Sequence, residues 1–168
     1  MSVPKEKDLN YSVLQPYVRP HGKPRAIIVD IDGTVAVHTD PVTGDPLRSH
    51  YDETMLHVDL PNPNVLRVVW AMQSQGYDVI FVSGRGQLES SWEATAAWLA
   101  EHFRRPYQGL FLRQVGDKRI DWQVKAEIFD KHIRHDYDVV AVFDDRDQVV
   151  NMWRHIGLTV LQVASGNF

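Results

Sequence analysis

Short apolar runs alternate with longer segments of helical periodicity along most of the chain. The apolar runs are AIIVD, YDVIFVSG, GLFL, DVVAVFDD and TVLQVA, and segments such as NPNVLRVVWAMQSQG and RDQVVNMWRHIG lie between them. Buried strands of a parallel sheet are short and almost continuously apolar, and helices connect one such strand to the next. The pattern therefore predicts an α/β fold, a three-layer Rossmann-like parallel sheet with helices on both faces.

Two of the helical segments carry apolar residues at regular spacing. In QLESSWEATAAWLAEHF and DWQVKAEIFDKHIRH these residues recur at i, i+4, i+7 and i+11. Gly76 and Gly157 each follow a helical pattern, at the position where a left-handed residue ends a helix. We expect both apolar stripes to face the core: Trp92, Ala96, Leu99 and Phe103 in the first, and Trp122, Ala126, Phe129 and Ile133 in the second.

Two segments have neither helical nor strand periodicity. Residues 1–24 are rich in proline, lysine and polar groups, and we expect a lead-in that lies along the surface or is flexible. Residues 25–168 then form the structured domain. Within it, residues 36–61 contain the turn-like DPVTGDP and are too few for an independent cap domain. They predict a small flap, or minimal cap, after the first strand.

Composition narrows the functions that this fold could carry. The 168 residues are 43% hydrophobic and can bury one core, and the absence of cysteine excludes disulfides, zinc thiolate sites and cysteine nucleophiles. A net charge of -4 argues against broad, sequence-independent coating of nucleic acid. No apolar run approaches the roughly 20 residues that span a bilayer, so we expect a cytoplasmic protein with no membrane partner.

Charged and polar residues follow three of the apolar runs. The run IIVD is followed by a second aspartate and Gly33, VIFV by a serine and an arginine, and VVAVF by two aspartates. Any one of these residues could cap a helix or form a turn. Three strand ends of this kind indicate an active site instead, since ligands bind beyond the carboxyl ends of parallel strands. The residues are Asp30 and Asp32, Ser83 and Arg85, and Asp144 and Asp145.

This set of side chains suits the transfer of a phosphoryl group. Four carboxylates at one edge would repel one another without a cation, and such hard oxygen ligands favour Mg²⁺. Ser83, Arg85 and Lys125 add hydrogen bonds and positive charge for phosphate oxygens. One aspartate of the first pair could attack phosphorus, and the second could supply and remove protons.

The motifs resemble those of the haloacid dehalogenase (HAD) superfamily of phosphatases. DIDGT resembles the signature DxDGT loop of that superfamily, VSGR its second motif, Lys125 its third and FDDR its acidic fourth. From about Arg25 to Phe168 the chain is also similar to the 3'-phosphatase domains of phage polynucleotide kinase-phosphatases. IIVDIDGTVA, RSHYD, GYDVIFVSGR, RQVGDKRIDWQVKAEIFDKHI and FDDRDQVVNMWRHIGLTVLQVASGNF carry that similarity.

The resemblance implies a separate role for each acidic residue. Asp30 would be the nucleophile, and Asp32 the general acid and base. The backbone carbonyl of Asp32, with Asp30 and Asp144, would bind Mg²⁺. Asp145 would support the metal's water molecules or the lysine.

Other residues would bind the substrate phosphate. The resemblance assigns this role to Ser83, Gly84 and Lys125, with the lysine also neutralising the aspartyl-phosphate. Three arginines stand where the family has arginines important for activity: Arg85, directly after VSG, and Arg48 and Arg113. A solvated surface cation is the alternative interpretation for Arg48 and Arg113, which lie on less regular segments.

The leading hypothesis is a Mg²⁺-dependent phosphatase that removes 3'-phosphates from DNA or RNA ends or from nucleoside 3'-monophosphates. The sequence lacks the GxxxxGK[ST] loop of the kinase, so we expect no kinase activity. The segment after VSGR is more acidic and apolar than its phage counterpart, which argues against extended polynucleotide contact there. The alternatives are a phosphatase for a small nucleotide or metabolite monophosphate, and a non-catalytic binder of phosphorylated ends. The sequence indicates no oligomeric state.

Overall fold

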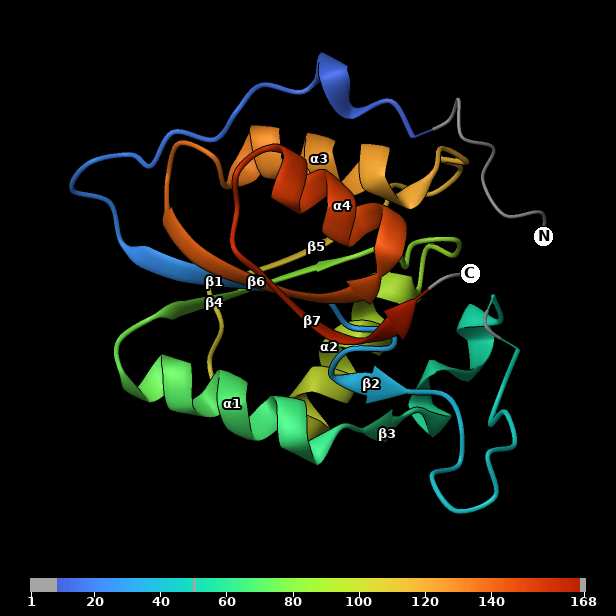
Figure 1. Ribbon diagram of the computed structural model, residues 1–168. Coiled ribbons are helices and arrows are strands. Elements are labelled where there is room, and N and C mark those ends of the chain that lie inside the picture. Colours follow the sequence, from blue (N-terminus) through green and yellow to red (C-terminus); the bar gives the residue numbers. More distant parts are fainter. Residues whose placement is uncertain (1–8, 50, 167–168) are drawn as a thin grey trace.

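A parallel sheet forms the middle layer of the protein (Figure 1). The computed structural model describes residues 9–49 and 51–166, and within them this sheet has five strands in the order β5-β4-β1-β6-β7. All neighbouring strands are parallel, which confirms the predicted α/β sheet. The strands are β1 (Arg25–Val29), β4 (Asp78–Ser83), β5 (Gly109–Leu112), β6 (Asp138–Arg146) and β7 (Val160–Gly166).

Two helices cover each face of the sheet, as predicted (Figure 1). On one face lie α1 (Pro63–Ser74) and α2 (Ser91–His102), and on the other α3 (Asp121–His132) and α4 (Asp147–His155). Phe81 and Phe103 pack in the first core layer, and Phe129 and Trp153 in the second. No helix among the described residues is long and apolar enough to cross a membrane.

The ends of α1 and α4 follow the sequence prediction, but one face of α2 does not. Gly76 and Gly157 have φ angles of 85° and 96°, the left-handed conformation expected after a helix. Trp92 was expected in the core and is 49% exposed. Leu99 and Phe103 of the same predicted stripe are buried, as expected. The buried face also includes Ser91, Thr95 and Trp98, so Trp92 lies at its edge, where the indole N–H donates to the Leu110 carbonyl.

The described part of the lead-in lies against the α3 and α4 layer. It contains a short 3₁₀ turn, η2 (Tyr11–Val13). The Tyr11 ring meets the edge of Trp122 at a centroid distance of 5.1 Å, and its hydroxyl donates to the Gln148 carbonyl. The Tyr17 ring packs edge-on against Phe129 at 5.4 Å. Residues 1–8 of the lead-in lie outside the described residues.

Residues 36–61, called the flap here, form a small structure beside the carboxyl ends of the strands (Figure 1). The flap begins with β2 (Ala36–Val37) and ends with β3 (Leu60–Pro61), which pair antiparallel. Between them, DPVTGDP forms a turn in which the Asp40 carboxylate accepts hydrogen bonds from the backbone of Val42 and Thr43. The 3₁₀ segment η3 (Glu53–Val58) then packs against α2.

Candidate active site

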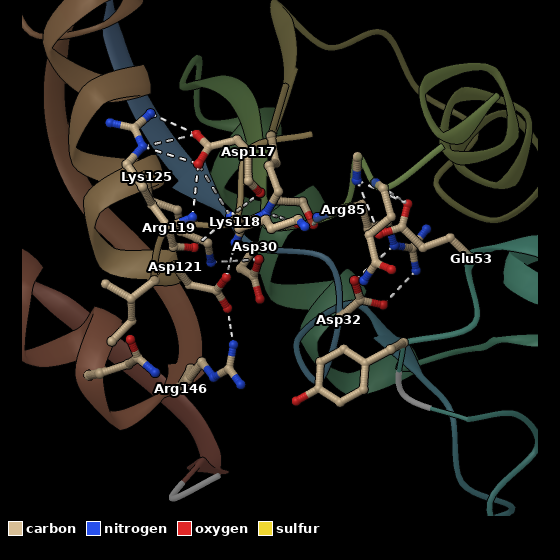
Figure 2. A pocket seen from close by; sticks show the side chains of 18 of the residues that line it. Asp30, Asp32, Glu53, Arg85, Asp117, Lys118, Arg119, Asp121, Lys125 and Arg146 are labelled. Carbon is tan, nitrogen blue, oxygen red and sulfur yellow. Dashed lines mark hydrogen bonds and ion pairs between the residues drawn. The ribbon is translucent and has the colours of Figure 1, made fainter. Parts of the chain in front are cut away.

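A cleft of about 810 Å³ opens at the carboxyl ends of the central strands (Figure 2). The strand order reverses at β1, since the chain proceeds from β1 to β4 on one side and places β6 on the other. This is where an open parallel sheet binds ligands. Of the residues predicted for the site, only Asp144 does not line the cleft; those that do are Asp30, Asp32, Arg48, Ser83, Gly84, Arg85, Arg113, Lys125 and Asp145.

Asp30 and Asp144 share one buried cation. Lys125, from α3, donates to the Asp30 Oδ1 atom at 2.7 Å and to the Asp144 Oδ2 atom at 2.8 Å. The Thr34 hydroxyl lies 3.4 Å from the other oxygen of Asp30. All three charged side chains are at most 6% exposed. The ion pairs therefore fix Asp30 at the end of β1, with one oxygen bound to the lysine.

Asp145 brings a third carboxylate to this group. Oxygens of Asp30, Asp144 and Asp145 lie within 4.8 Å of one another. Burial raises the pKa of Asp30 well above its usual range, and the neighbouring acids raise it further against the opposing charge of Lys125. Burial and the charge of Asp144 raise the pKa of Asp145 to about 7. One ammonium group, that of Lys125, thus faces three carboxylates, so their negative charge is only partly neutralised.

Gly33 allows this close arrangement. Its φ angle is 76°, and a Cβ atom at this position would lie 2.0 Å from an oxygen of Asp145. Any other residue would be strained by the left-handed backbone and would also displace the carboxylate. The glycine of DIDGT thus lets the loop after β1 pack against Asp145, near the carboxyl end of β6.

Asp32 lies in different surroundings, among arginines. Arg85 binds it through two parallel hydrogen bonds, from Nε at 2.8 Å and from Nη2 at 2.7 Å, and Arg48 adds a third bond at 3.1 Å. Burial opposes ionisation of Asp32, but Arg85, with smaller effects from His38 and Arg48, lowers the pKa of Asp32 to about 2. Its side chain is 23% exposed, so this carboxylate reaches the cleft.

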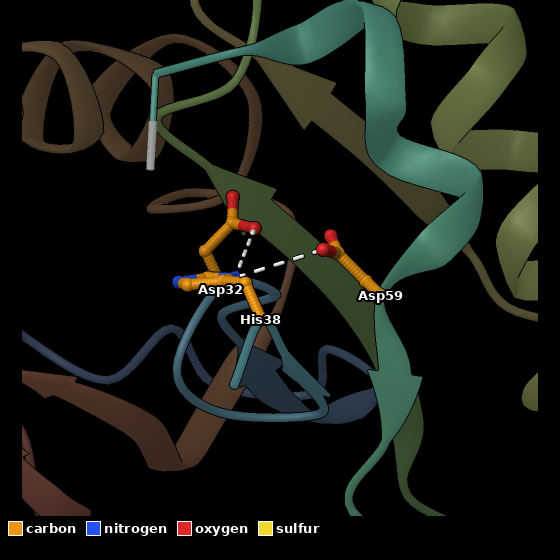
Figure 3. A group of neighbouring side chains, drawn as sticks. All are labelled: Asp32, His38 and Asp59. Atoms are coloured by element: carbon orange, nitrogen blue, oxygen red, sulfur yellow. Dashed lines mark ion pairs between the residues drawn. The ribbon is translucent and has the colours of Figure 1, made fainter. Parts of the chain in front are cut away.

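A second acidic group, formed by Asp32, His38 and Asp59, is already neutralised by protein cations (Figure 3). The Nδ1 atom of His38 lies 3.7 Å from Asp32 and 3.8 Å from Asp59. Arg48 and Arg85 both bind Asp59 as well as Asp32. The two guanidinium groups stand where a metal ion would have to lie, so this group does not suit a metal. Figure 2 shows Asp32 on the side of Arg85 and Glu53, away from Lys125.

The loop after β4 is held by a carboxylate from the flap. Glu53 accepts hydrogen bonds from the backbone N–H groups of Gly86 at 2.9 Å and Gln87 at 3.0 Å, and from the Ser91 hydroxyl. Ser83, at the end of β4, is fully buried, and its hydroxyl oxygen accepts from the Arg85 N–H group at 3.3 Å. The bonds of Glu53 hold the loop that follows the VSGR motif against the flap.

Arg113, directly after β5, lines the cleft and binds other parts of the protein. It donates to the Gly84 carbonyl at 2.9 Å and pairs with Asp121, which also pairs with Arg146 (Figure 2). Arg113 and Arg48 are thus at the cleft, and neither is a solvated surface cation. The sequence interpretation missed Asp59, Glu53, His38, Asp121 and Arg146. Of these, only Arg146 had a local signal, since it completes FDDR.

The α/β sheet, the two aspartates after β1, the buried lysine and the acidic pair at the end of β6 together define a HAD-like phosphatase. The sequence model of one family within that class, the phosphatase domain of polynucleotide kinase (PNKP), matches residues 24–168. The chain belongs to this family, which confirms the resemblance found in the motifs.

Relatives with similar sequences and structures are longer proteins. A putative bifunctional polynucleotide kinase/RNA ligase of Autographa californica nuclear polyhedrosis virus is 34% identical over 143 residues, which is 83% of this chain and 19% of that protein. The solved structure of a Pnkp1/Rnl/Hen1 complex aligns with a TM-score of 0.79 at 34% identity, over 95% of this chain and 52% of the other. A second structure, of the Pnkp1/Rnl/Hen1 RNA repair complex, gives 0.80 at 34% identity, over 94% and 48%. The chain thus spans about half, or less, of these relatives.

Proposed function

We propose that this protein is a Mg²⁺-dependent polynucleotide 3'-phosphatase that works through an aspartyl-phosphate on Asp30. The observation that carries the proposal is the contrast between two aspartates on one loop. Asp30 is bound to Lys125 at 2.7 Å and is nearly buried, whereas Asp32 is held by Arg85 and faces the cleft. A fixed nucleophile and a separate carboxylate for proton transfer are the two groups that this chemistry needs.

The reaction then has two steps. An oxygen of Asp30 attacks phosphorus, the bond from phosphorus to the leaving oxygen breaks, and that oxygen receives a proton through Asp32. In the second step water attacks the phosphorus of the aspartyl-phosphate and gives a proton to Asp32. The bond from phosphorus to the Asp30 oxygen breaks, which restores the Asp30 carboxylate and releases inorganic phosphate. The Lys125 ammonium group, bound to Oδ1 of Asp30, balances the negative charge during both steps.

The first step needs a source for that proton. Asp32 is ionised in the free protein, since its pKa is about 2. A phosphate monoester has a second pKa of about 6 and can bring the proton to the site as its monoanion. The Asp32 carboxylate faces the cleft. It would take this proton from the substrate and pass it to the leaving oxygen.

The acidic group beside Lys125 fits Mg²⁺. Its three carboxylates, those of Asp30, Asp144 and Asp145, are buried, supply only oxygen ligands, and are only partly neutralised by one lysine. We assign the metal to Asp30, Asp144 and the backbone carbonyl of Asp32, with Asp145 beside it. A bound Mg²⁺ would neutralise phosphate oxygens as charge shifts between the attacking and leaving atoms.

Two observations support a polynucleotide end as the substrate. The cleft volume of about 810 Å³ exceeds the space for a phosphate group alone, and the flap leaves Asp32 exposed to solvent. The relatives include a putative polynucleotide kinase/RNA ligase and an RNA repair complex. A terminal phosphate on a DNA or RNA chain fits an acidic protein, because only one phosphate needs to enter.

A substrate panel tests this function. The panel would contain two forms of the same oligonucleotide, one phosphorylated at its 3' end and one at its 5' end, together with a nucleoside 3'-monophosphate and a sugar phosphate. Release of phosphate from each would be measured with Mg²⁺ and with chelator. We expect Mg²⁺-dependent release of phosphate, fastest from the 3'-phosphorylated oligonucleotide. Preference for the sugar phosphate would favour a metabolite phosphatase. Binding of 3'-phosphorylated ends without turnover of any substrate would show a non-catalytic binder.

A further inference from the structure

Asp59, at the end of η3 in the flap, is a fully buried carboxylate that joins the two arginines bound to Asp32. Its Oδ1 atom accepts from Arg48 Nε at 2.6 Å. Its Oδ2 atom accepts from Arg48 Nη2 and from Arg85 Nη2, both at 2.8 Å. The side chain of Asp59 is 0% exposed, so no part of it can contact substrate.

We propose that Asp59 is a positioning residue for proton transfer. By binding both Arg48 and Arg85, it holds the two guanidinium groups in the orientation in which they form hydrogen bonds to Asp32. The flap thereby takes part in the chemistry without contacting the substrate. The inference rests on the proposed function, since it takes Asp32 as the group that moves the proton.

The surroundings of Asp59 make it a rigid anchor. The Trp98 indole N–H donates to the backbone carbonyl of Asp59 at 2.9 Å, which ties the end of η3 to α2. The Thr95 hydroxyl, also on α2, lies 3.3 Å from Arg85 Nη1. The Arg85 guanidinium group therefore contacts the flap, α2 and Asp32 at once. A planar group with this many fixed partners has one orientation.

Asp59 is also needed to balance the charges of Arg48 and Arg85. Arg48 and Arg85 are each 1% exposed at the side chain, and Asp32 alone would leave one buried positive charge without a partner. An unpaired buried charge is costly, and the arginines would shift to regain partners. With Asp59 the two cations face two carboxylates. Asp32 then stays where it can give a proton to a leaving oxygen, a transfer that works only at hydrogen-bond distance.

The dependence of rate on the leaving group separates this role from plain structural support. p-Nitrophenyl phosphate and p-nitrobenzyl phosphate have the same ring, but the first releases an acidic phenol and the second a weakly acidic alcohol. Only the alcohol needs a proton from Asp32 as it leaves. The ratio of kcat/KM between the two esters does not depend on the fraction of folded enzyme, because unfolded protein lowers both values equally.

We expect Asp59→Asn to lower kcat/KM for the benzyl ester about ten-fold or more beyond any loss with the phenyl ester. The matched control is Glu53→Gln, which makes the same charge change at a second buried flap carboxylate. Glu53 binds the loop after β4 and has no hydrogen bond to Arg48 or Arg85 among those described. The control should leave the ratio of the two esters unchanged.

A second variant keeps the test decisive if Asp59→Asn does not fold. Arg48→Lys retains the positive charge, but one ammonium group cannot reproduce the two-sided bonding of a guanidinium group to Asp32 and Asp59. We expect the same change in ratio. Equal loss with both esters in a folded variant, or no loss at all, would overturn the role of Asp59. A wild-type protein inactive on every monoester would instead contradict the proposed function.

Discussion

Asp30 and Asp32 are two residues apart, yet they belong to different electrostatic groups. Asp30 shares Lys125 with Asp144, and burial raises the pKa of Asp30. Asp32 is bound by two arginines and has a pKa of about 2. Neighbours from distant parts of the chain, and not the shared residue type, thus separate the two roles that we assign.

Replacement of Asp30, the proposed nucleophile, tests the covalent mechanism directly. Asp30→Asn keeps the size of the side chain and removes the attacking carboxylate, so we expect turnover of a 3'-phosphorylated oligonucleotide to fall about a thousand-fold or more. Circular dichroism should show an unchanged fold, because Lys125 retains Asp144 as a partner. Activity near that of the wild type would exclude attack by Asp30.

At the scale of elements, strands and their ends could be predicted because their signals are local. The apolar runs and the polar residues that follow them mark β1, β4 and β6, and the topology then brings Asp30, Ser83 and Asp144 to one edge. In α2 the prediction was right for Leu99 and Phe103 and wrong for Trp92, since Trp92 and Trp98 are both apolar and only packing shows which is buried. The spacing of apolar residues predicts that a helix is present, but tertiary contacts decide which side of the helix faces the core.

The flap could be located from the sequence but not interpreted. Its lack of periodicity marked it as irregular, and nothing in its residues distinguished Asp59 or Glu53 from solvated acids. Asp59 meets Arg85 from 26 residues away, and Glu53 meets Gln87 from 34. Contacts at such separation follow from the folded topology, so no short motif records them.

The turn after β1 provides a prediction about an element. Gly33→Ala should inactivate the protein, because its Cβ atom would meet the Asp145 carboxylate at 2.0 Å. Gly22→Ala is the control, since Gly22 has a similar φ of 73° and no atom within 4 Å of such a Cβ. Each substitution costs about 1–2 kcal/mol for left-handed backbone. Unfolding in urea should show a larger loss of stability for Gly33→Ala, and equal losses would contradict this packing.

At the scale of the whole molecule, Mg²⁺ should stabilise the fold. A ligand that binds only the folded state raises the free energy of unfolding, by about 2.7 kcal/mol at a concentration 100 times its Kd. We expect Mg²⁺ to raise the midpoint of thermal unfolding for the wild type and much less for Asp144→Asn. Asp147→Asn is the control, because Asp147 lies outside the acidic group and binds Gln162. An equal increase in Asp144→Asn would place the metal elsewhere.

The central position of β1 in the sheet also bears on how the protein is made. The ribosome synthesises the DIDGT loop before its partners, since Arg85 follows Asp32 by 53 residues and Lys125 follows Asp30 by 95. Both neighbours of β1 in the sheet, β4 and β6, come later in the chain. A nascent chain that stops before β6 would carry Asp30, the proposed nucleophile, and Lys125 but not Asp144, so we expect catalysis to begin only after β6 has been added.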